Sequence, residues 1–206
     1  MMRRLGILLS GRGSNFEAIA DHIDRNELDA QIAVVISNVS QAPGLEKARQ
    51  RGLEATFIGS KGLPREEFDR RLVASLEERQ VDLVCLAGFM RLLSPYFIKS
   101  FPHRILNIHP SLLPSFPGLN AQRQALEYGV KYTGCTVHFV DESLDSGPII
   151  LQAVVPVLDT DTEETLSARI LAEEHKIYSK AIRLVLDNQI RVDGRHVVEV
   201  AANPGH

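Results

Sequence analysis

The chain has 206 residues, of which 44% are hydrophobic and 24% charged, and its net charge at pH 7 is -3. This composition is ordinary for a globular protein and excludes the strongly basic character of a nucleic-acid-binding or membrane-surface protein. No stretch reaches the roughly 18 apolar residues of a membrane-spanning helix. Cys85 and Cys135 lie in apolar runs, which favours buried thiols over a disulfide or a metal site. The cytoplasm is therefore the expected compartment.

The first half of the chain alternates short apolar runs with helical patterns. Strands are predicted at residues 5–9, 32–36, 55–58, 81–87 and 104–108, and helices at residues 16–25, 44–51 and 65–80. This alternation is typical of parallel βαβ units whose sheet is covered by helices. We therefore expect a Rossmann-like α/β half over about residues 1–100.

The second half is richer in strands. Residues 133–140 and 149–157 predict an antiparallel pair joined by the turn-rich segment 141–148. A long amphipathic helix is expected from Thr162 to about Asp187, followed by a short strand pair near residues 190–200. The two halves together predict one domain of residues 1–206, built on a single mixed sheet with helices on both faces.

Residues 10–16, with the sequence SGRGSNF, join the first strand to the first helix. The glycines allow a ligand to approach the backbone, and Ser14 or Asn15 can cap a helix whose free amides bind phosphate. The dinucleotide fingerprint fails because Phe16 replaces its third glycine and the second strand ends without a ribose-binding acid. A phosphate monoester is therefore favoured over NAD or ATP. A tight turn without a ligand is the alternative.

Asn107 and His109 lie two residues apart at the end of a predicted strand, so their side chains point to the same face. Both can then converge on one reacting atom. The carboxylate of Asp145, in the turn-rich segment, can stabilise the imidazolium of His109. That imidazolium and the amide of Asn107 can both donate to an oxyanion, which predicts acyl transfer without a covalent intermediate.

Plainer interpretations exist for the same residues. A histidine before a proline is commonly a structural hydrogen-bond donor, and Asp145 taken alone fits a turn. A metal site of His103, His109 and His138 lacks the usual ligand spacing, so no metal is expected. A nucleophile at Ser111 lacks the Gly-x-Ser-x-Gly turn.

Several segments together resemble one known family. NIHPSLLP at residues 107–114 and FPG at residues 116–118 resemble the formyltransferases that use 10-formyltetrahydrofolate. SGRGSN at residues 10–15 narrows the resemblance to the phosphoribosylglycinamide formyltransferases of purine biosynthesis, and LAGFMR, VHFV and EH at residues 86–91, 137–140 and 174–175 fit them too. The resemblance implies the formyltransferase fold. It also implies formyl transfer from 10-formyltetrahydrofolate to the amine of glycinamide ribonucleotide, releasing tetrahydrofolate, on the route to IMP.

The resemblance also implies individual roles, with the family's catalytic residues falling on Asn107, His109 and Asp145. Thr136 and His138 are expected behind them, where a water can be held. The ribonucleotide site that it implies consists of Arg12, Gly13, Ser14, Asn15, Asn107 and Glu174. The folate site that it implies consists of Arg65, Met90, Arg91, Leu92, Leu93, Val140, Asp141 and Asp145.

Some positions leave alternatives open. Without the resemblance, residues 90–93 fit core packing at a strand end rather than an apolar wall for a heterocycle, and Arg65 fits a solvated helix start. Asn120 and Gln122 stand where many family members carry histidines. Arg12 either adds charge beside a phosphate or faces solvent.

Other functions compete with this interpretation. Methionyl-tRNA formyltransferase carries a further carboxy-terminal domain for tRNA and formyltetrahydrofolate hydrolase a further amino-terminal domain. The length of this chain and its phosphate loop are therefore expected to exclude both. A non-catalytic mononucleotide-binding module explains the glycine loop but leaves the Asn107, His109 and Asp145 trio unexplained. The expected partners are small-molecule substrates, with no nucleic acid and no membrane. The sequence indicates no oligomeric state.

Overall fold

The computed structural model describes residues 2–200 of the chain. Its strands are β1 (Arg3–Leu9), β2 (Ala30–Ser37), β3 (Ala55–Phe57), β4 (Leu83–Leu86), β5 (Ile105–His109), β6 (Tyr132–Phe139), β7 (Ile149–Pro156), β8 (Ile190–Asp193) and β9 (His196–Glu199). Its helices are α1 (Ser14–Asp24), α2 (Pro43–Gln50), α3 (Arg65–Glu78), α4 (Pro95–Ser100), α5 (Ala121–Tyr128) and α6 (Glu163–Leu186).

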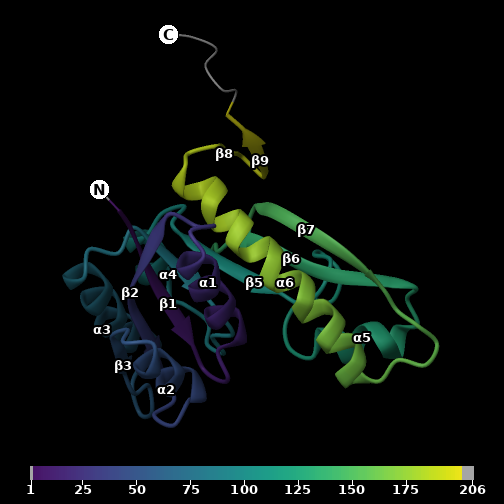
Figure 1. Cartoon of the computed structure of the whole chain (residues 1–206), viewed down its shortest axis with the longest axis horizontal. Helices are drawn as coiled ribbons and strands as arrows, with labels where there is room; N and C mark the ends of the chain where they lie inside the picture. The colour runs from purple at the N-terminus through teal and green to yellow at the C-terminus, as the bar shows by residue number, and fades with distance from the viewer. Residues whose placement is uncertain (1, 201–206) are drawn as a thin grey trace.

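Seven of the strands form one sheet with the order β3-β2-β1-β4-β5-β6-β7, and β8 and β9 form a separate hairpin (Figure 1). Strands β1 to β5 run parallel, whereas β6 pairs antiparallel with β5 and with β7. The predicted mixed sheet, parallel in its first half and antiparallel in its second, is confirmed.

Helices cover both faces of the sheet, as the sequence predicts. On one face, Phe16 of α1 and Tyr178 of α6 join a core that includes Ile7 of β1. On the opposite face, Phe68 of α3 packs in a second core that includes Leu8 of β1. Since successive strand residues point to opposite faces, β1 contributes to both cores. No helix among residues 2–200 has the length and apolar character needed to cross a membrane.

The start of α6 shows how local sequence sets an element. The hydroxyl of Thr162 accepts the backbone N–H of Thr165 at 3.3 Å, and the hydroxyl of Thr165 accepts the backbone N–H of Thr162 at 3.0 Å. This reciprocal capping satisfies donors that the first helical turn leaves free. The predicted start of the helix is confirmed.

Two features of the fold differ from the sequence prediction. Helices α4 and α5 are not predicted, because α4 has only six residues and the buried side chains of α5 are those of Ala121 and Ala125. The residue that caps α1 is Gly13, with φ 72° and no side-chain hydrogen bond, so the prediction that Ser14 or Asn15 caps this helix is wrong. Gly13 is required there because its φ is left-handed and a Cβ would lie 3.0 Å from the Cα of Gly44.

The sheet order creates a topological switch point between β1 and β4. From β1 the chain adds β2 and β3 toward one edge of the sheet, and from β4 it adds β5, β6 and β7 toward the other edge. Ligands of open α/β sheets bind at the carboxyl ends of the strands beside such a point. The loops after these strands are joined there, since the backbone N–H of Ser10 donates to the carbonyl of Gly88 at 2.9 Å. Strand β5 is the next strand in the sheet and ends at His109.

Candidate active site

The antiparallel pairing of β5 and β6 places Asn107 directly opposite His138. The side-chain nitrogen of Asn107 lies 3.2 Å from Nε2 of His138, whose Nδ1 lies 2.8 Å from the carbonyl of Phe139. A carbonyl can only accept, so the N–H of the neutral ring is on Nδ1 and Nε2 accepts from the amide. This contact fixes the orientation of the Asn107 amide and leaves its second N–H and its oxygen for a ligand.

His109 ends β5 and is buried, with 5% of its surface exposed. Its Nε2 donates to the carbonyl of Phe116 at 2.8 Å, and its Nδ1 lies 3.4 Å from Oδ2 of Asp145. The imidazolium is the form of the ring that meets both of these acceptors with an N–H. The carboxylate of Asp145 therefore lies where it can balance a positive charge on this ring.

Asp145 connects these groups. Its Oδ1 lies 3.9 Å from Nε2 of His138, and its Oδ2 accepts the backbone N–H of Gly118 at 2.8 Å. The side chains of Asn107, His138, Asp145 and His109 thus lie in a row, the polar chain, across β5, β6 and the loop after β6. Nε2 of His138 and the carboxylate of Asp145 are both acceptors, so no hydrogen bond joins these two members. The structure brings the predicted amide, imidazole and carboxylate together.

The loop after β6 is shaped by its own side chains. Asp141 accepts the backbone N–H of Ser143 at 3.0 Å and the hydroxyl of Ser146 at 2.9 Å, which forms an Asx turn. Gly147 is required, since a Cβ there would lie 1.8 Å from the carbonyl of the last residue of β6. The loop turns back over β5 and presents Asp145, which has a left-handed φ of 46°.

The hydroxyls of Thr136 and Ser111 form hydrogen bonds with the backbone of the segment that follows β5. The hydroxyl of Thr136 donates to the carbonyl of Ser111 at 2.7 Å and accepts the backbone N–H of Leu113 at 3.0 Å. Thr136 therefore anchors residues 111–113 from its position opposite His109. The expectation that Thr136 and His138 hold a water behind the catalytic groups stays a prediction. The hydroxyl of Ser111 donates to the carbonyl of Ser115 at 2.5 Å, which gives it no role as a nucleophile.

The predicted ribonucleotide residues lie at the amino end of α1. No side chain caps this helix, so its first amides face the loop at the switch point. Asn15 donates from its side-chain nitrogen to Glu174 of α6 at 2.8 Å, while its buried side-chain oxygen has no hydrogen-bond partner among residues 2–200. Burial raises the pKa of Glu174. Arg12 is exposed.

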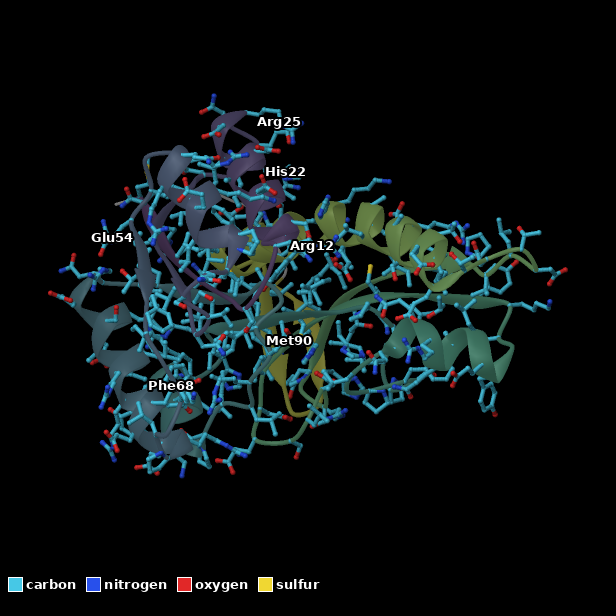
Figure 2. The ribbon with its side chains drawn as sticks, turned by 90° about the horizontal axis from the view of Figure 1, so that it is seen from below. Arg12, His22, Arg25, Glu54, Phe68 and Met90 are labelled. Carbon is cyan, nitrogen blue, oxygen red and sulfur yellow. The ribbon has the colours of Figure 1, made fainter. Side chains whose placement is uncertain are left out.

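The predicted folate residues follow β4. Met90 is 66% exposed and Leu92 is 52% exposed, so the alternative of core packing is wrong for these two side chains, whereas Leu93 packs against the core that contains Phe68. Leu93 is half-buried, and the guanidinium of Arg91 lies 5.0 Å from the ring centre of Phe68. Arg65 is exposed at the start of α3. Figure 2 shows Met90 near the middle of the molecule, on a loop joined to the one that carries Arg12.

Ser10 joins the two predicted substrate regions, and sequence reasoning did not find this contact. Its hydroxyl accepts the backbone N–H of Met90 at 2.8 Å and donates to the side-chain oxygen of Asn38 at 2.6 Å. Ser10 belongs to the glycine loop, whereas Met90 belongs to the predicted folate wall. No local sequence pattern reveals a contact between residues 80 positions apart.

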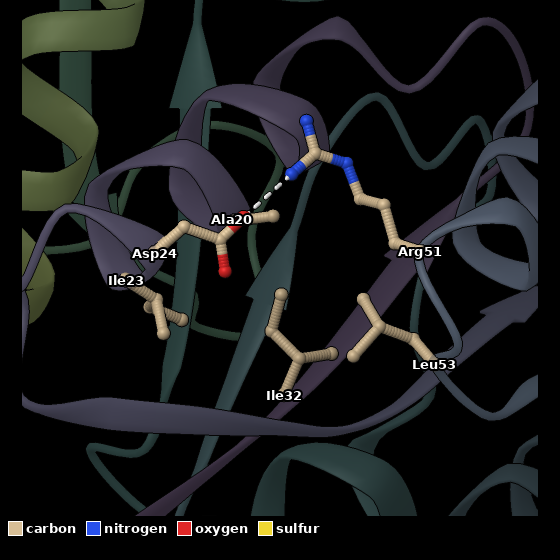
Figure 3. Close-up of a pocket in the computed structure, with 6 residues that line it drawn as sticks. All are labelled: Ala20, Ile23, Asp24, Ile32, Arg51 and Leu53. Carbon is tan, nitrogen blue, oxygen red and sulfur yellow. Dashed lines mark hydrogen bonds and ion pairs between the residues drawn. The ribbon is translucent and has the colours of Figure 1, made fainter.

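Two hollows lie away from this site. One of about 70 Å³ lies between α1 and β2 and is bordered by Arg51, which is paired with Asp24 at 3.1 Å (Figure 3). The other, of about 370 Å³, lies between the β8–β9 hairpin and the amino ends of β4 and β5. Neither contains a residue of the polar chain. Among residues 2–200, no three histidine, cysteine or acidic side chains are grouped as metal ligands.

The burial of His138 predicts a pH dependence of stability. Burial lowers the pKa of His138 below its ordinary value of 6.5, so around and below that pH the unfolded chain binds a proton more readily than the folded chain. The free energy of unfolding is therefore undiminished above about pH 6.5 and falls as the pH drops toward the lowered pKa. We expect urea unfolding of His138→Gln to depend less steeply on pH in this acid range. An acid limb as steep as that of the wild type and of the control His196→Gln, on the exposed β9, would contradict this expectation.

Comparison with known proteins shows the family. The sequence profile described as Formyl transferase matches residues 3–182. The chain belongs to the formyl transferase family. This confirms the expected family.

Individual members of the formyl transferase family are similar over most of the chain. The phosphoribosylglycinamide formyltransferase of Escherichia coli (strain K12) is 46% identical over 187 residues, which cover 90% of this chain and 88% of that protein. The crystal structure of glycinamide ribonucleotide transformylase 1 from Symbiobacterium toebii superposes with a TM-score of 0.95 at 54% identity, covering 97% of this chain and 94% of the other.

A longer relative is also similar. The trifunctional purine biosynthetic protein adenosine-3 of Homo sapiens is 49% identical over 190 residues, which cover 92% of this chain but 19% of that protein. The chain therefore spans about a fifth of the length of this trifunctional relative.

Proposed function

We propose that this protein transfers the formyl group of 10-formyltetrahydrofolate to the amine of glycinamide ribonucleotide, giving the N-formyl product and tetrahydrofolate in purine biosynthesis. The observation that carries the proposal is the polar chain from Asn107 through His138 and Asp145 to His109. In this arrangement an amide and an imidazole share the end of β5, with a carboxylate beside them. Similarity to the formyltransferases of Escherichia coli and Symbiobacterium toebii supports the choice of substrates.

In the proposed mechanism, Asn107 and His109 stabilise the charge that develops on the formyl oxygen when the amine attacks. Asn107 donates its second N–H, since its first is held by His138. His109 donates as the imidazolium, and Asp145 balances its charge through the Nδ1 side. Each such donor contributes about 10²–10³ in rate. The tetrahedral intermediate then releases tetrahydrofolate as the nitrogen of the folate takes up a proton and the attacking amine loses one.

The segment after β5 must change its contacts for this to happen. The Nε2–H of His109 donates to the carbonyl of Phe116, and Asp145 accepts the amide of Gly118. In our proposal the formyl oxygen replaces the Phe116 carbonyl as the acceptor for His109. The Gly118 contact holds Asp145 in place meanwhile.

The two substrates are assigned to two regions of one formyltransferase domain. We assign the ribonucleotide phosphate to the start of α1, with Asn15 and Glu174 close to the sugar or glycinamide portion. The half of the chain up to about residue 100 supplies most of these groups. We assign the folate to residues 90–93, where Met90 and Leu92 are exposed, to Arg65 and to the loop of residues 140–145. The half from about residue 101 supplies the catalytic groups. The free buried thiols of Cys85 and Cys135 support action in the reducing cytoplasm.

The proposal is tested by incubating the purified protein with both substrates. We expect formylated ribonucleotide and tetrahydrofolate to appear in equal amounts, at a rate that a metal chelator leaves unchanged. Release of formate without ribonucleotide would instead favour a formyltetrahydrofolate hydrolase. Tight ribonucleotide binding without turnover would favour a non-catalytic mononucleotide-binding module.

Arg12 offers a specific test of the ribonucleotide site. Arg12→Ala should raise the KM for glycinamide ribonucleotide about tenfold and leave kcat nearly unchanged, because a hydrogen bond to a charged group contributes about 1.5–3 kcal/mol. Arg25→Ala is the matched control, since Arg25 is an exposed arginine just after the other end of α1. An unchanged ribonucleotide KM in Arg12→Ala would place this side chain in solvent.

A further inference from the structure

Asp69 of α3 is an acidic residue in an unusual place. It is 1% exposed and belongs to the buried stripe of this helix, between Phe68 and Leu72. The other acidic residues of the first turns, Glu66 and Glu67, are exposed and paired with arginines one turn later. Burying a carboxylate is costly unless it is hydrogen-bonded and paired with positive charge. The contacts of Asp69 therefore indicate what it does.

One oxygen of Asp69 holds the end of the segment 88–94. Its Oδ2 accepts the backbone N–H of Ser94 at 2.5 Å, and the hydroxyl of Ser94 in turn caps α4. The beginning of the segment is held by Ser10, which accepts the backbone N–H of Met90. Residues 90–92, of which Met90 and Leu92 are exposed, thus lie between two points that are held by side chains of other elements.

The second oxygen of Asp69 makes no hydrogen bond within the described part of the chain. Oδ1 of Asp69 and Nε of Arg91 are both buried and have no hydrogen-bond partner within residues 2–200. The guanidinium of Arg91 lies against the ring of Phe68, the neighbour of Asp69 on α3. Burial raises the pKa of Asp69, whereas its bond to Ser94 and the nearby charges of Arg91 and Arg65 lower it. A carboxylate oxygen of Asp69 and an N–H of Arg91 are therefore both buried without a hydrogen bond, and the charge of Arg91 is near enough to act on Asp69.

We propose that Asp69 is a positioning residue for the folate: it fixes residues 90–94 through Ser94 and orients Arg91 through its second oxygen. This inference rests on the proposed function, because it takes the segment 90–93 as the folate wall. Asp69 itself contacts no substrate. A folate that packs on Met90 and Leu92 presses the segment toward α3, and the Nε–H of Arg91 then donates to Asp69. The affinity for folate thereby depends on the negative charge of Asp69, which lies beneath residues 90–93.

The variant Asp69→Asn tests this proposal. Asparagine keeps an oxygen for the N–H of Ser94 and nearly the same volume, but it lacks the charge that orients Arg91. We expect the KM for 10-formyltetrahydrofolate to rise about tenfold, the amount that a charge-assisted hydrogen bond supplies. The KM for glycinamide ribonucleotide and kcat should change less than about twofold. A purely structural role would instead lower the melting temperature and kcat without separating the two KM values.

Two further variants make the test specific. Glu66→Gln removes the same charge one turn away on the exposed face of α3 and should leave the folate KM unchanged. In an Arg91→Met background, Asp69→Asn should raise the folate KM no further, because the partner through which it acts is gone. Additive effects of the two changes, or an unchanged folate KM in Asp69→Asn, overturn the proposal.

Binding of tetrahydrofolate, measured by calorimetry, separates this proposal from the proposed function. If the wild type binds tetrahydrofolate but forms no formylated ribonucleotide, the proposed function fails, and weaker binding by Asp69→Asn still supports the positioning role. Equal binding by the wild type and Asp69→Asn overturns the role. If the wild type does not bind tetrahydrofolate, the folate wall and the role of Asp69 are both overturned.

Discussion

His109→Ala is expected to lower kcat for formyl transfer by about 10²–10³-fold and to leave both KM values close to those of the wild type. The reason is that His109 donates to charge that is present in the transition state and absent from the bound substrates. His109 ends β5, is buried and lies 3.4 Å from a carboxylate, and alanine offers no N–H in its place. Steady-state assays with each substrate varied in turn measure the effect.

A nearby histidine provides the control for this variant. His103 is exposed on the turn before β5 and has a left-handed φ of 54°, which asparagine tolerates well. His103→Asn should therefore retain the activity of the wild type. A near-normal kcat in His109→Ala would refute the assigned role of the imidazolium and with it the proposed mechanism.

Replacing Asp145 should have the second-largest effect. Asp145→Asn keeps an oxygen for the N–H of Gly118 and suits the left-handed φ of 46°, so the loop should retain its shape. It removes the negative charge that faces His109, and we expect kcat to fall about 100-fold. Asp145→Ala loses the charge and the Gly118 contact and should be at least as impaired.

Comparison of these two Asp145 variants separates charge from structure. If the charge matters most, both lose orders of magnitude in kcat while circular dichroism stays that of the wild type. Asp159→Asn, an exposed carboxylate paired with Lys131, serves as the control and should be fully active. An Asp145→Asn enzyme with wild-type turnover would show that this carboxylate only holds the loop.

Local sequence patterns predict the helices and strands whose apolar residues contrast clearly with their polar neighbours. The apolar runs that become β1, β4 and β5 are evident because parallel strands are buried on both faces. Helix α5 escapes prediction because its buried residues are alanines, which give little contrast with their polar neighbours. The capping of α1 was misjudged because the chain uses the conformation of Gly13 there instead of a side-chain oxygen.

In the candidate site, too, some features follow from local sequence and others depend on contacts between distant segments. Asn107 and His109 could be paired from strand periodicity alone, but the contact of Asn107 with His138 depends on the register of two antiparallel strands. The contacts of Phe116 and Gly118 depend on how the segment after β5 folds back. The position of Asp69 in the apolar stripe of α3 could have been noticed in the sequence. Burying an acidic side chain costs free energy unless it has a partner, so this position indicates a specific contact.

The hydroxyl of Ser10 has a thermodynamic consequence for the two binding sites. It lies in the loop assigned to the ribonucleotide and holds a backbone amide of the segment assigned to the folate. Any displacement of this loop by one ligand therefore changes the free energy with which the other binds. Linkage requires this effect to be reciprocal, so each substrate must alter the dissociation constant of its counterpart by the same factor.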